Sequence, residues 1–254
     1  GERHRLPADF MSFQGAEWLE RRERALEEQP EAVLDVMELG PGDVVADVGC
    51  GSGYYARRMA GRVGPGGLVY CVDIQQEMLD IMQVLADRDR IIGIVPLLSD
   101  DDDLKLPAGE IDWILLADVY HEMSKFESML AGMRGSLAPG GRVALLEYRI
   151  EDGTGDNLKS DHAMSVRQVL AEWLSAGFAL ADLYEFLPSQ HLFIMKAAGD
   201  VKVPGAPILN FDVFEAVDRR LVEVEAIGSG GMSVTIRIRN LSDKKMLVTM
   251  PVGV

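Results

Sequence analysis

The sequence is poor in cysteine, in long apolar runs and in positive charge. Its 254 residues include only two cysteines, Cys50 and Cys71, so we expect neither a disulfide framework nor a zinc site built on several thiolates. No apolar run approaches the roughly 18–20 uncharged residues of a membrane-spanning helix. Only 25 Lys and Arg residues face 41 Asp and Glu residues, and the resulting net charge of −16 disfavours nucleic-acid binding.

The remaining composition is that of a soluble globular protein. Apolar residues make up 48% of the chain, which is enough for a sizeable core. The scarcity of cysteine suits a cytoplasmic protein, although exported proteins can also lack disulfides. The first residue is Gly1 rather than Met, which leaves a removed leader open.

Short apolar, β-branched segments alternate with helical segments through the first two thirds of the chain. Such alternation predicts right-handed βαβ units and a parallel sheet. Helices over 16–28 and 30–39 are expected before this region, and a further helix over 164–176 after it. Within the region we expect strands at 44–48, 68–72, 91–96, 111–117 and 142–148, and helices at 54–63, 75–86 and 123–137.

The end of this region departs from the parallel pattern. Two further strands, 180–186 and 191–196, are joined by the loop 187–190, which is short enough for an antiparallel pair. We therefore predict a Rossmann-like α/β fold, with a mostly parallel seven-stranded sheet and a reversed last strand.

The character of the chain changes after this domain, which we place at residues 1–198. Residues 199–207 contain two prolines and read as a linker. Apolar and polar residues alternate over 221–226 and 233–239, which is typical of half-buried antiparallel strands. With a third strand at 245–250, residues 208–254 form a small all-β appendage, expected to be part of a larger β-module that could contact a partner or another copy of the chain.

A glycine-rich turn after the first strand is the main chemical signal. Gly49, Gly51 and Gly53 alternate between the strand and the next helix. Glycines in such a turn let a nucleotide-like cofactor come close to the backbone and lie against the amino end of the next helix. Asp47, which ends the strand, can accept a hydrogen bond from a cofactor amine. Turns of this kind also occur where packing alone requires them.

A second signal is Asp73, which closes the second strand 20 residues beyond Gly53. A carboxylate there can accept both hydroxyls of a ribose, although an aspartate can also cap the helix that follows. The same arrangement would suit NAD. However, dinucleotide sites favour G-x-G-x-x-G, and the aromatic Tyr54 and Tyr55 stand where the last glycine would be. They would obstruct a pyrophosphate but suit a cofactor without one.

With these motifs in place, residues 43 to 148 resemble a class I S-adenosylmethionine (SAM)-dependent methyltransferase of the broad group related to the ubiquinone/menaquinone methyltransferases. The stretches that carry the resemblance are VADVGCGSGY at 45–54, VYCVDI at 69–74, DWILLADVYHE at 112–122 and LAPGGR at 137–142. They span about half of the chain. The resemblance implies SAM as the cofactor, S-adenosylhomocysteine as its product, and a small-molecule methyl acceptor that it does not name.

The resemblance also implies a set of cofactor contacts. An acidic residue after the third strand binds the adenine amine in such proteins, which points to Asp100 or Asp101, unless residues 100–103 are only a solvated acidic turn. Asp118, after the fourth strand, could contact the amine of the methionine portion. The predicted cofactor-binding residues are therefore Asp47, Gly49, Cys50, Gly51, Gly53, Tyr54, Asp73, Ile74, Asp100, Asp101 and Asp118.

His121 is the candidate for proton transfer, because histidine titrates near neutral pH. Members of the family that the chain resembles often carry His-Glu at this place in a structural role, so His121 could serve either in proton transfer or in the structure of the loop. His162 and His191 are weaker candidates. A missing base would not argue against methyl transfer, because the sulfonium is already activated and alignment supplies much of the acceleration.

Two other functions remain as alternatives, an NAD(P)-binding oxidoreductase and a non-catalytic SAM-binding or regulatory module. A metal-dependent catechol-type enzyme would need clustered carboxylates and an amide. Asp118, Asp152, Asp156 and Asn157 have the wrong spacing for that, so we expect no metal.

Overall fold

The computed structural model describes residues 7–151, 160–198, 209–212, 222–228, 234–241 and 246–249. The chain divides into two units, Gly1–Gly199 and Asp200–Val254. The predicted linker 199–207 lies outside the described residues.

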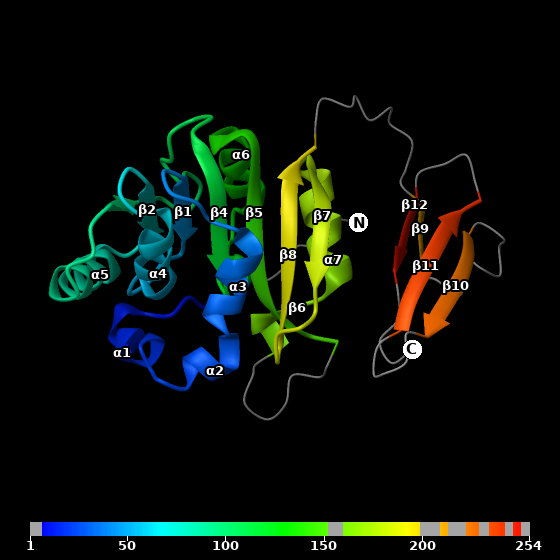
Figure 1. Cartoon of the computed structure of the whole chain (residues 1–254), viewed down its shortest axis with the longest axis horizontal. Coiled ribbons are helices and arrows are strands. Elements are labelled where there is room, and N and C mark those ends of the chain that lie inside the picture. The colour runs from blue at the N-terminus through cyan, green and yellow to red at the C-terminus, as the bar shows by residue number, and fades with distance from the viewer. Residues whose placement is uncertain are drawn as a thin grey trace. The chain divides into compact units, whose positions relative to one another are not determined.

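A single sheet crosses the larger unit, with helices on both of its faces (Figure 1). Its strand order is β3-β2-β1-β4-β5-β8-β7, and the short β6 pairs with β5. Only β8 is reversed, because it runs antiparallel to both β5 and β7. This confirms the predicted fold class. The strands are β1 (Val44–Val48), β2 (Leu68–Asp73), β3 (Ile94–Leu98), β4 (Ile111–Ala117), β5 (Leu137–Arg149), β6 (Ala163–Met164), β7 (Phe178–Tyr184) and β8 (Gln190–Ala197).

The helices follow the expected apolar periodicity and connect these strands. The main ones are α3 (Pro30–Met37), α4 (Tyr54–Val63), α5 (Gln76–Arg88), α6 (Phe126–Ser136) and α7 (Val166–Ser175). Shorter ones are η1 (Phe13–Gly15), α1 (Ala16–Leu19), α2 (Arg24–Glu28), η2 (Tyr120–Glu122) and η3 (Ser160–His162).

The prediction of one continuous helix over 16–28 was wrong, because the chain turns between α1 and α2. The last turn of α1 has a hydrogen bond between residues three apart, in which the Glu20 amide donates to the Glu17 carbonyl. Arg24 then donates from Nη1 to the Leu19 carbonyl at 3.0 Å. A side chain that satisfies a terminal carbonyl replaces the next turn of helix, so the segment breaks here.

Buried apolar residues line both faces of the sheet. In β8 every residue from Gln190 to Met195 is buried, as expected of a strand covered on both sides. At one edge Trp173 of α7 is fully buried, and its ring packs against Tyr120 and Phe178 with centroids 5.4 and 4.8 Å away. This packing fixes η2, and with it the loop that follows β4.

The strand order reverses between β1 and β4. From β1 the chain proceeds outward to β2 and β3, whereas β4 returns to the other side of β1. Loops leave the carboxyl ends of these two strands in opposite directions, which opens a crevice between them. The glycine loop and the segment after β4 therefore meet at one place.

The smaller unit consists of two strand pairs in its described parts. β10 (Val222–Gly228) and β11 (Val234–Asn240) pair antiparallel, as predicted, and Glu223 lies opposite Arg239 in an ion pair. The predicted third strand does not join them. It forms β12 (Met246–Thr249), which pairs in parallel with β9 (Leu209–Asp212). β9 was not predicted, because its four residues are too few to show a period. In the described parts of both units, no helix is long and apolar enough to cross a membrane.

Candidate active site

A cavity of about 1240 Å³ opens at the carboxyl ends of the central strands. Its wall is formed by the glycine loop, the residues after β2 and β4, the end of β5, and the front helices α1 and α2. Pockets that hold one small ligand are typically about 300–1,000 Å³. The cavity therefore has room for a cofactor and a second molecule beside it.

The glycine loop packs so closely against neighbouring side chains that there is no space for a Cβ atom at Gly49 or Gly51. Gly49 and Gly51 have φ angles of 71° and 52°, in the left-handed region. A Cβ on Gly49 would lie 2.3 Å from Cγ2 of Val119, and a Cβ on Gly51 would lie 2.8 Å from Cδ1 of Leu19. Side chains here would also narrow the cavity, whose wall both glycines form together with Cys50.

Asp73 joins the glycine loop to β2. Its Oδ2 accepts from the Gly51 amide and its Oδ1 from the Gln75 amide, both at 2.9 Å. Burial raises the pKa of Asp73 more than these backbone hydrogen bonds lower it. The side chain is 7% exposed, and the residue lines the cavity beside Ile74. Asp73 thus holds the loop and presents a carboxylate at the cavity wall.

Three of the cofactor residues predicted in and around the glycine loop, Asp47, Gly53 and Tyr54, do not line the cavity. Asp47 is buried, and its Oδ2 accepts from the Ala56 amide at 2.9 Å, so it ties β1 to α4. Burial raises the pKa of Asp47 to about 7. Tyr54 packs beneath the Arg24 guanidinium, 4.1 Å from its ring centroid. These residues support the loop from behind.

The two acids considered for adenine differ in position. Asp101 lines the cavity and pairs with Lys125 at 2.9 Å. Asp100 lies outside its wall and pairs with Lys105 at 3.0 Å. The buried Ser99 also lines the cavity, which the sequence reasoning missed because a lone serine carries no signal.

Asp118 follows β4 with a φ of 54° and reaches the cavity. Its Oδ2 accepts from Nε2 of Gln190 at 2.6 Å, whereas its buried Oδ1 has no hydrogen-bond partner among the described residues. Burial, and then the charges of Glu28 and Glu147, hold the pKa of Asp118 well above its usual range. An unpaired acceptor in this position is suited to a ligand that donates a hydrogen bond.

His121 is 3% exposed and lines the cavity. Its Nδ1 lies 2.7 Å from Oε2 of Glu147, and its own amide donates to Oε1 of the same carboxylate at 3.2 Å. The other ring nitrogen, Nε2, has no hydrogen-bond partner among the described residues. His162 also lines the cavity, and its ring centroid lies 5.1 Å from that of His121.

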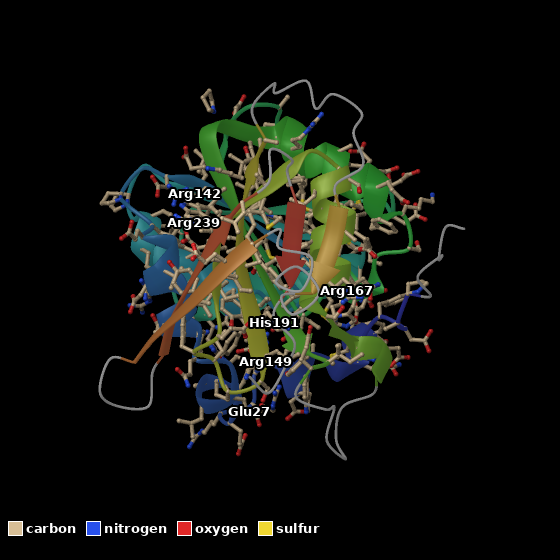
Figure 2. All side chains as sticks on the ribbon, turned by 90° about the vertical axis from the view of Figure 1, so that its right-hand side faces the viewer. Glu27, Arg142, Arg149, Arg167, His191 and Arg239 are labelled. Carbon is tan, nitrogen blue, oxygen red and sulfur yellow. A yellow bond between two sulfur atoms is a disulfide. The ribbon has the colours of Figure 1, made fainter. Side chains whose placement is uncertain are left out.

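His191 has a different role from the one considered for it, since it does not line the cavity. Its Nδ1 lies 2.7 Å from Glu185 and its Nε2 lies 3.0 Å from Glu151. Burial alone would lower the pKa of His191, but the two carboxylates outweigh burial and raise it. Nearby, the Arg149 amide donates to the Ser189 carbonyl, and Figure 2 shows Arg149 and His191 in the same region of the unit.

The front helices supply wall residues that the sequence reasoning missed. Arg24 and Glu28 form a buried ion pair at 2.7 Å, and both line the cavity. Their spacing of four residues could have predicted this ion pair, because residues of opposite charge at positions i and i+4 face each other on a helix. Glu20 binds Ser52 at 2.6 Å and also pairs with Arg57, so it fastens this segment to the glycine loop and α4.

Cys50 and Cys71 form a single disulfide, which the expectation of no disulfide framework did not address. Cys50 is the second residue after β1, and Cys71 lies in the neighbouring β2, so their Cα atoms are 5.5 Å apart. Counting two cysteines excludes a framework of several bridges but cannot exclude one bridge between adjacent strands. The bond fastens the glycine loop to the sheet. Among the described residues no group of three or more His, Cys, Asp or Glu side chains could hold a metal ion.

Comparison with known proteins shows what part of the larger unit is similar to. Residues 45–141 match the family described as a methyltransferase domain. The larger unit is therefore similar to class I SAM-dependent methyltransferases in sequence and in fold. The ubiquinone/menaquinone biosynthesis C-methyltransferase UbiE of Burkholderia mallei is 34% identical over 152 residues, which are 58% of this chain and 59% of that protein. The UbiE protein of Burkholderia thailandensis matches equally well.

Solved structures of this methyltransferase fold agree with the topology. A SAM-dependent methyltransferase from Aquifex aeolicus has a TM-score of 0.69 at 22% identity, and the match covers 73% of this chain and 98% of that one. The cyclase SpnF has a TM-score of 0.53 at 22% identity, over 61% of this chain and 58% of that one. The fold therefore occurs with more than one named chemistry.

Thiol labelling tests the Cys50–Cys71 bond. We expect the chain denatured without reductant to take up no iodoacetamide, and the reduced chain to take up two equivalents. Because the bond closes a loop of 21 residues, its reduction should lower the free energy of unfolding in urea by about 3 kcal/mol in the chain-entropy account. Two reactive thiols before reduction would show that the bond is absent.

The His191 cluster predicts a pH-dependent stability. A raised folded-state pKa stabilises the fold most below the ordinary value of 6.5, and the contribution is lost as pH rises through the raised value. We expect His191→Gln to lower the free energy of unfolding by about 1–3 kcal/mol at pH 6 and by less at pH 9. The half-exposed Glu185 reduces the effect through solvent screening. Urea unfolding at both pH values measures it, and an equal loss at both would contradict the account.

Proposed function

We propose that this chain transfers a methyl group from SAM to a small-molecule nucleophile and releases S-adenosylhomocysteine. The observation that carries the proposal is the hydrogen bond between the Gly51 amide and Asp73, which brings the glycine loop and a ribose-type carboxylate to one cavity wall. The matched stretch spans 59% of the UbiE relative. That protein is named a C-methyltransferase, and for this chain carbon, oxygen and nitrogen acceptors all remain within the proposal.

The cavity residues fit SAM by position and by charge. Gly49 and Gly51 would allow close approach of the cofactor, Asp73 would accept from the ribose hydroxyls, and Asp101 would accept from the adenine amine. The unpaired Oδ1 of Asp118 would accept from the amino group of the methionine portion. Eight carboxylate residues against three arginines line the cavity, which favours a cationic ligand. The carboxylates are those of Asp9, Glu23, Glu27, Glu28, Asp73, Asp101, Asp118 and Glu122.

SAM supplies an activated methyl group, so the protein has mainly to align the acceptor with it. Rigid placement of two reactants removes much of the entropic cost of reaction. The disulfide, the Asp73 hydrogen bonds and the Glu20 contacts all fix the loop on the cofactor side. The side of the cavity that Tyr148 and His162 line would receive the acceptor.

We also propose that the strand unit Asp200–Val254 contacts a partner or another copy of the chain. Ile238 and Leu241, both apolar, are 39% and 50% exposed. Size-exclusion chromatography of the full chain and of residues 1–198 tests this proposal. It predicts a larger assembly only for the full chain.

Calorimetric titration separates the proposed function from its main alternative. We expect SAM and S-adenosylhomocysteine to bind one site per chain and NADH not to bind. Binding of NADH alone would exclude the methyltransferase assignment. Release of S-adenosylhomocysteine in the presence of a panel of small phenols, amines and thiols then tests turnover, and tight SAM binding without any turnover would favour the regulatory alternative.

A substitution at Asp73 tests the cofactor geometry. Asp73→Asn removes the charge that would strengthen hydrogen bonds from the ribose, so we expect S-adenosylhomocysteine to bind about 1–3 kcal/mol more weakly. Asp100→Asn is the matched control, because Asp100 lies after β3 but outside the cavity wall. Equal affinities of Asp73→Asn and the unmodified chain would remove Asp73 from the site.

A further inference from the structure

The side chain of His121 combines burial with one unused ring nitrogen. The residue lines the cavity, yet Nε2 is buried and has no hydrogen-bond partner among the described residues. A buried polar atom without a partner costs free energy, so its retention needs a reason. A ligand in the cavity that donates a hydrogen bond to Nε2 supplies one.

Glu147 determines which nitrogen is available. It is fully buried near the end of β5, its Oε1 accepts from the His121 amide, and its Oε2 lies 2.7 Å from Nδ1 of His121. A neutral ring that donates from Nδ1 to this carboxylate has a free lone pair on Nε2, and this is the tautomer that we assign to His121. Two hydrogen bonds to one side chain also fix the orientation of the ring.

Other titratable groups surround this ring. Asp118 follows β4, Glu122 belongs to η2 with His121 itself, and His162 faces the ring from η3. Burial alone lowers the pKa of His121, but the charge and hydrogen bond of Glu147, helped by Asp118 and Glu122, raise it overall. Burial raises the pKa of Glu122 to about 7. These neighbours therefore stabilise the protonated ring of His121.

The arginines of the cavity wall are already paired. Arg21 pairs with Glu27, Arg24 pairs with Glu28, and Arg149 pairs with Glu185. Carboxylate and phosphate groups are usually bound by guanidinium groups free to make two hydrogen bonds. Together with the surplus of wall carboxylates, this disfavours an anionic acceptor.

We propose that His121 and Glu147 form a proton-accepting dyad, and that the methyl acceptor is an uncharged molecule whose nucleophilic atom carries a proton. This inference rests on the proposed function. As the nucleophile forms its bond to the methyl carbon, the carbon–sulfur bond breaks with its electron pair going to sulfur. The proton of the nucleophile passes to Nε2, and Glu147 stabilises the imidazolium. Glu147 is a positioning residue, since it acts through His121.

The dyad has a consequence that can be measured without an acceptor. The positive charge of SAM, if it faces His121, disfavours the imidazolium and lowers its pKa, whereas the uncharged sulfur of S-adenosylhomocysteine does not. We expect the pKa of His121 to be lower with SAM than with S-adenosylhomocysteine by about one pH unit or more. His191 is the internal control, because it lies outside the cavity wall.

Nitrogen-15 NMR titration of the histidine rings in the full chain makes this measurement and also reports the tautomer. We expect His121 to carry its proton on Nδ1 above its pKa, and Glu147→Gln to lower that pKa. Glu151→Gln is the matched control, because Glu151 pairs with His191 instead. It should lower the pKa of His191 and leave that of His121 in place. If Glu147→Gln does not fold, the comparison of SAM with its product in the unmodified chain still decides.

The outcomes separate this inference from the proposed function. Failure of both SAM and S-adenosylhomocysteine to bind would contradict the proposed function. Binding of both with equal His121 pKa values, or an Nε2–H tautomer, would overturn the dyad while leaving the methyltransferase assignment in place.

Small probes test the acceptor class in the same spectra. With S-adenosylhomocysteine at saturation, we expect phenol at about 10 mM to shift the His121 Nε2 resonance and benzoate at the same concentration to leave it unchanged. Phenol is uncharged with an acidic proton, and benzoate is its anionic counterpart. A response to benzoate alone, or to neither probe, would overturn the assignment of acceptor class.

Discussion

The hydrogen bond from the Gly51 amide to Asp73 is the interaction on which the site depends. It holds the glycine loop, which leaves β1, against the end of β2, and the Cys50–Cys71 bond repeats the connection covalently. Because the strand order reverses between β1 and β4, the loop fixed in this way forms one wall of an open crevice. The fold thus places a rigid backbone surface where a nucleoside can lie.

The segment after β4 and the end of β5 supply the opposite wall, which is chemically different. Asp118, His121 and Glu147 bring two carboxylates and an imidazole together in a buried setting. Buried groups of this kind interact strongly, and their protonation states depend on one another. A bound cation would change that balance, so cofactor charge and proton transfer are coupled in our account.

The sequence was sufficient for the parts of the structure that are local in the chain. Alternating glycines, the apolar strand before them and Asp73 at the next strand end predicted the fold and one cavity wall. Contacts between distant residues were out of reach, such as Glu147 with His121, 26 positions apart. The Cys50–Cys71 bond needed the strand pairing, and the break between α1 and α2 depends on where one arginine side chain donates. Asp47 and Tyr54 show the converse, because a motif position does not reveal which side of the loop a side chain occupies.

A crystal structure of the full chain with S-adenosylhomocysteine tests the central claim most directly. Our account predicts one molecule in the 1240 Å³ cavity, with its ribose hydroxyls on Asp73 and its sulfur on the side of His121 Nε2. A ribose bound away from Asp73, or a sulfur separated from His121 by the cofactor itself, would contradict it.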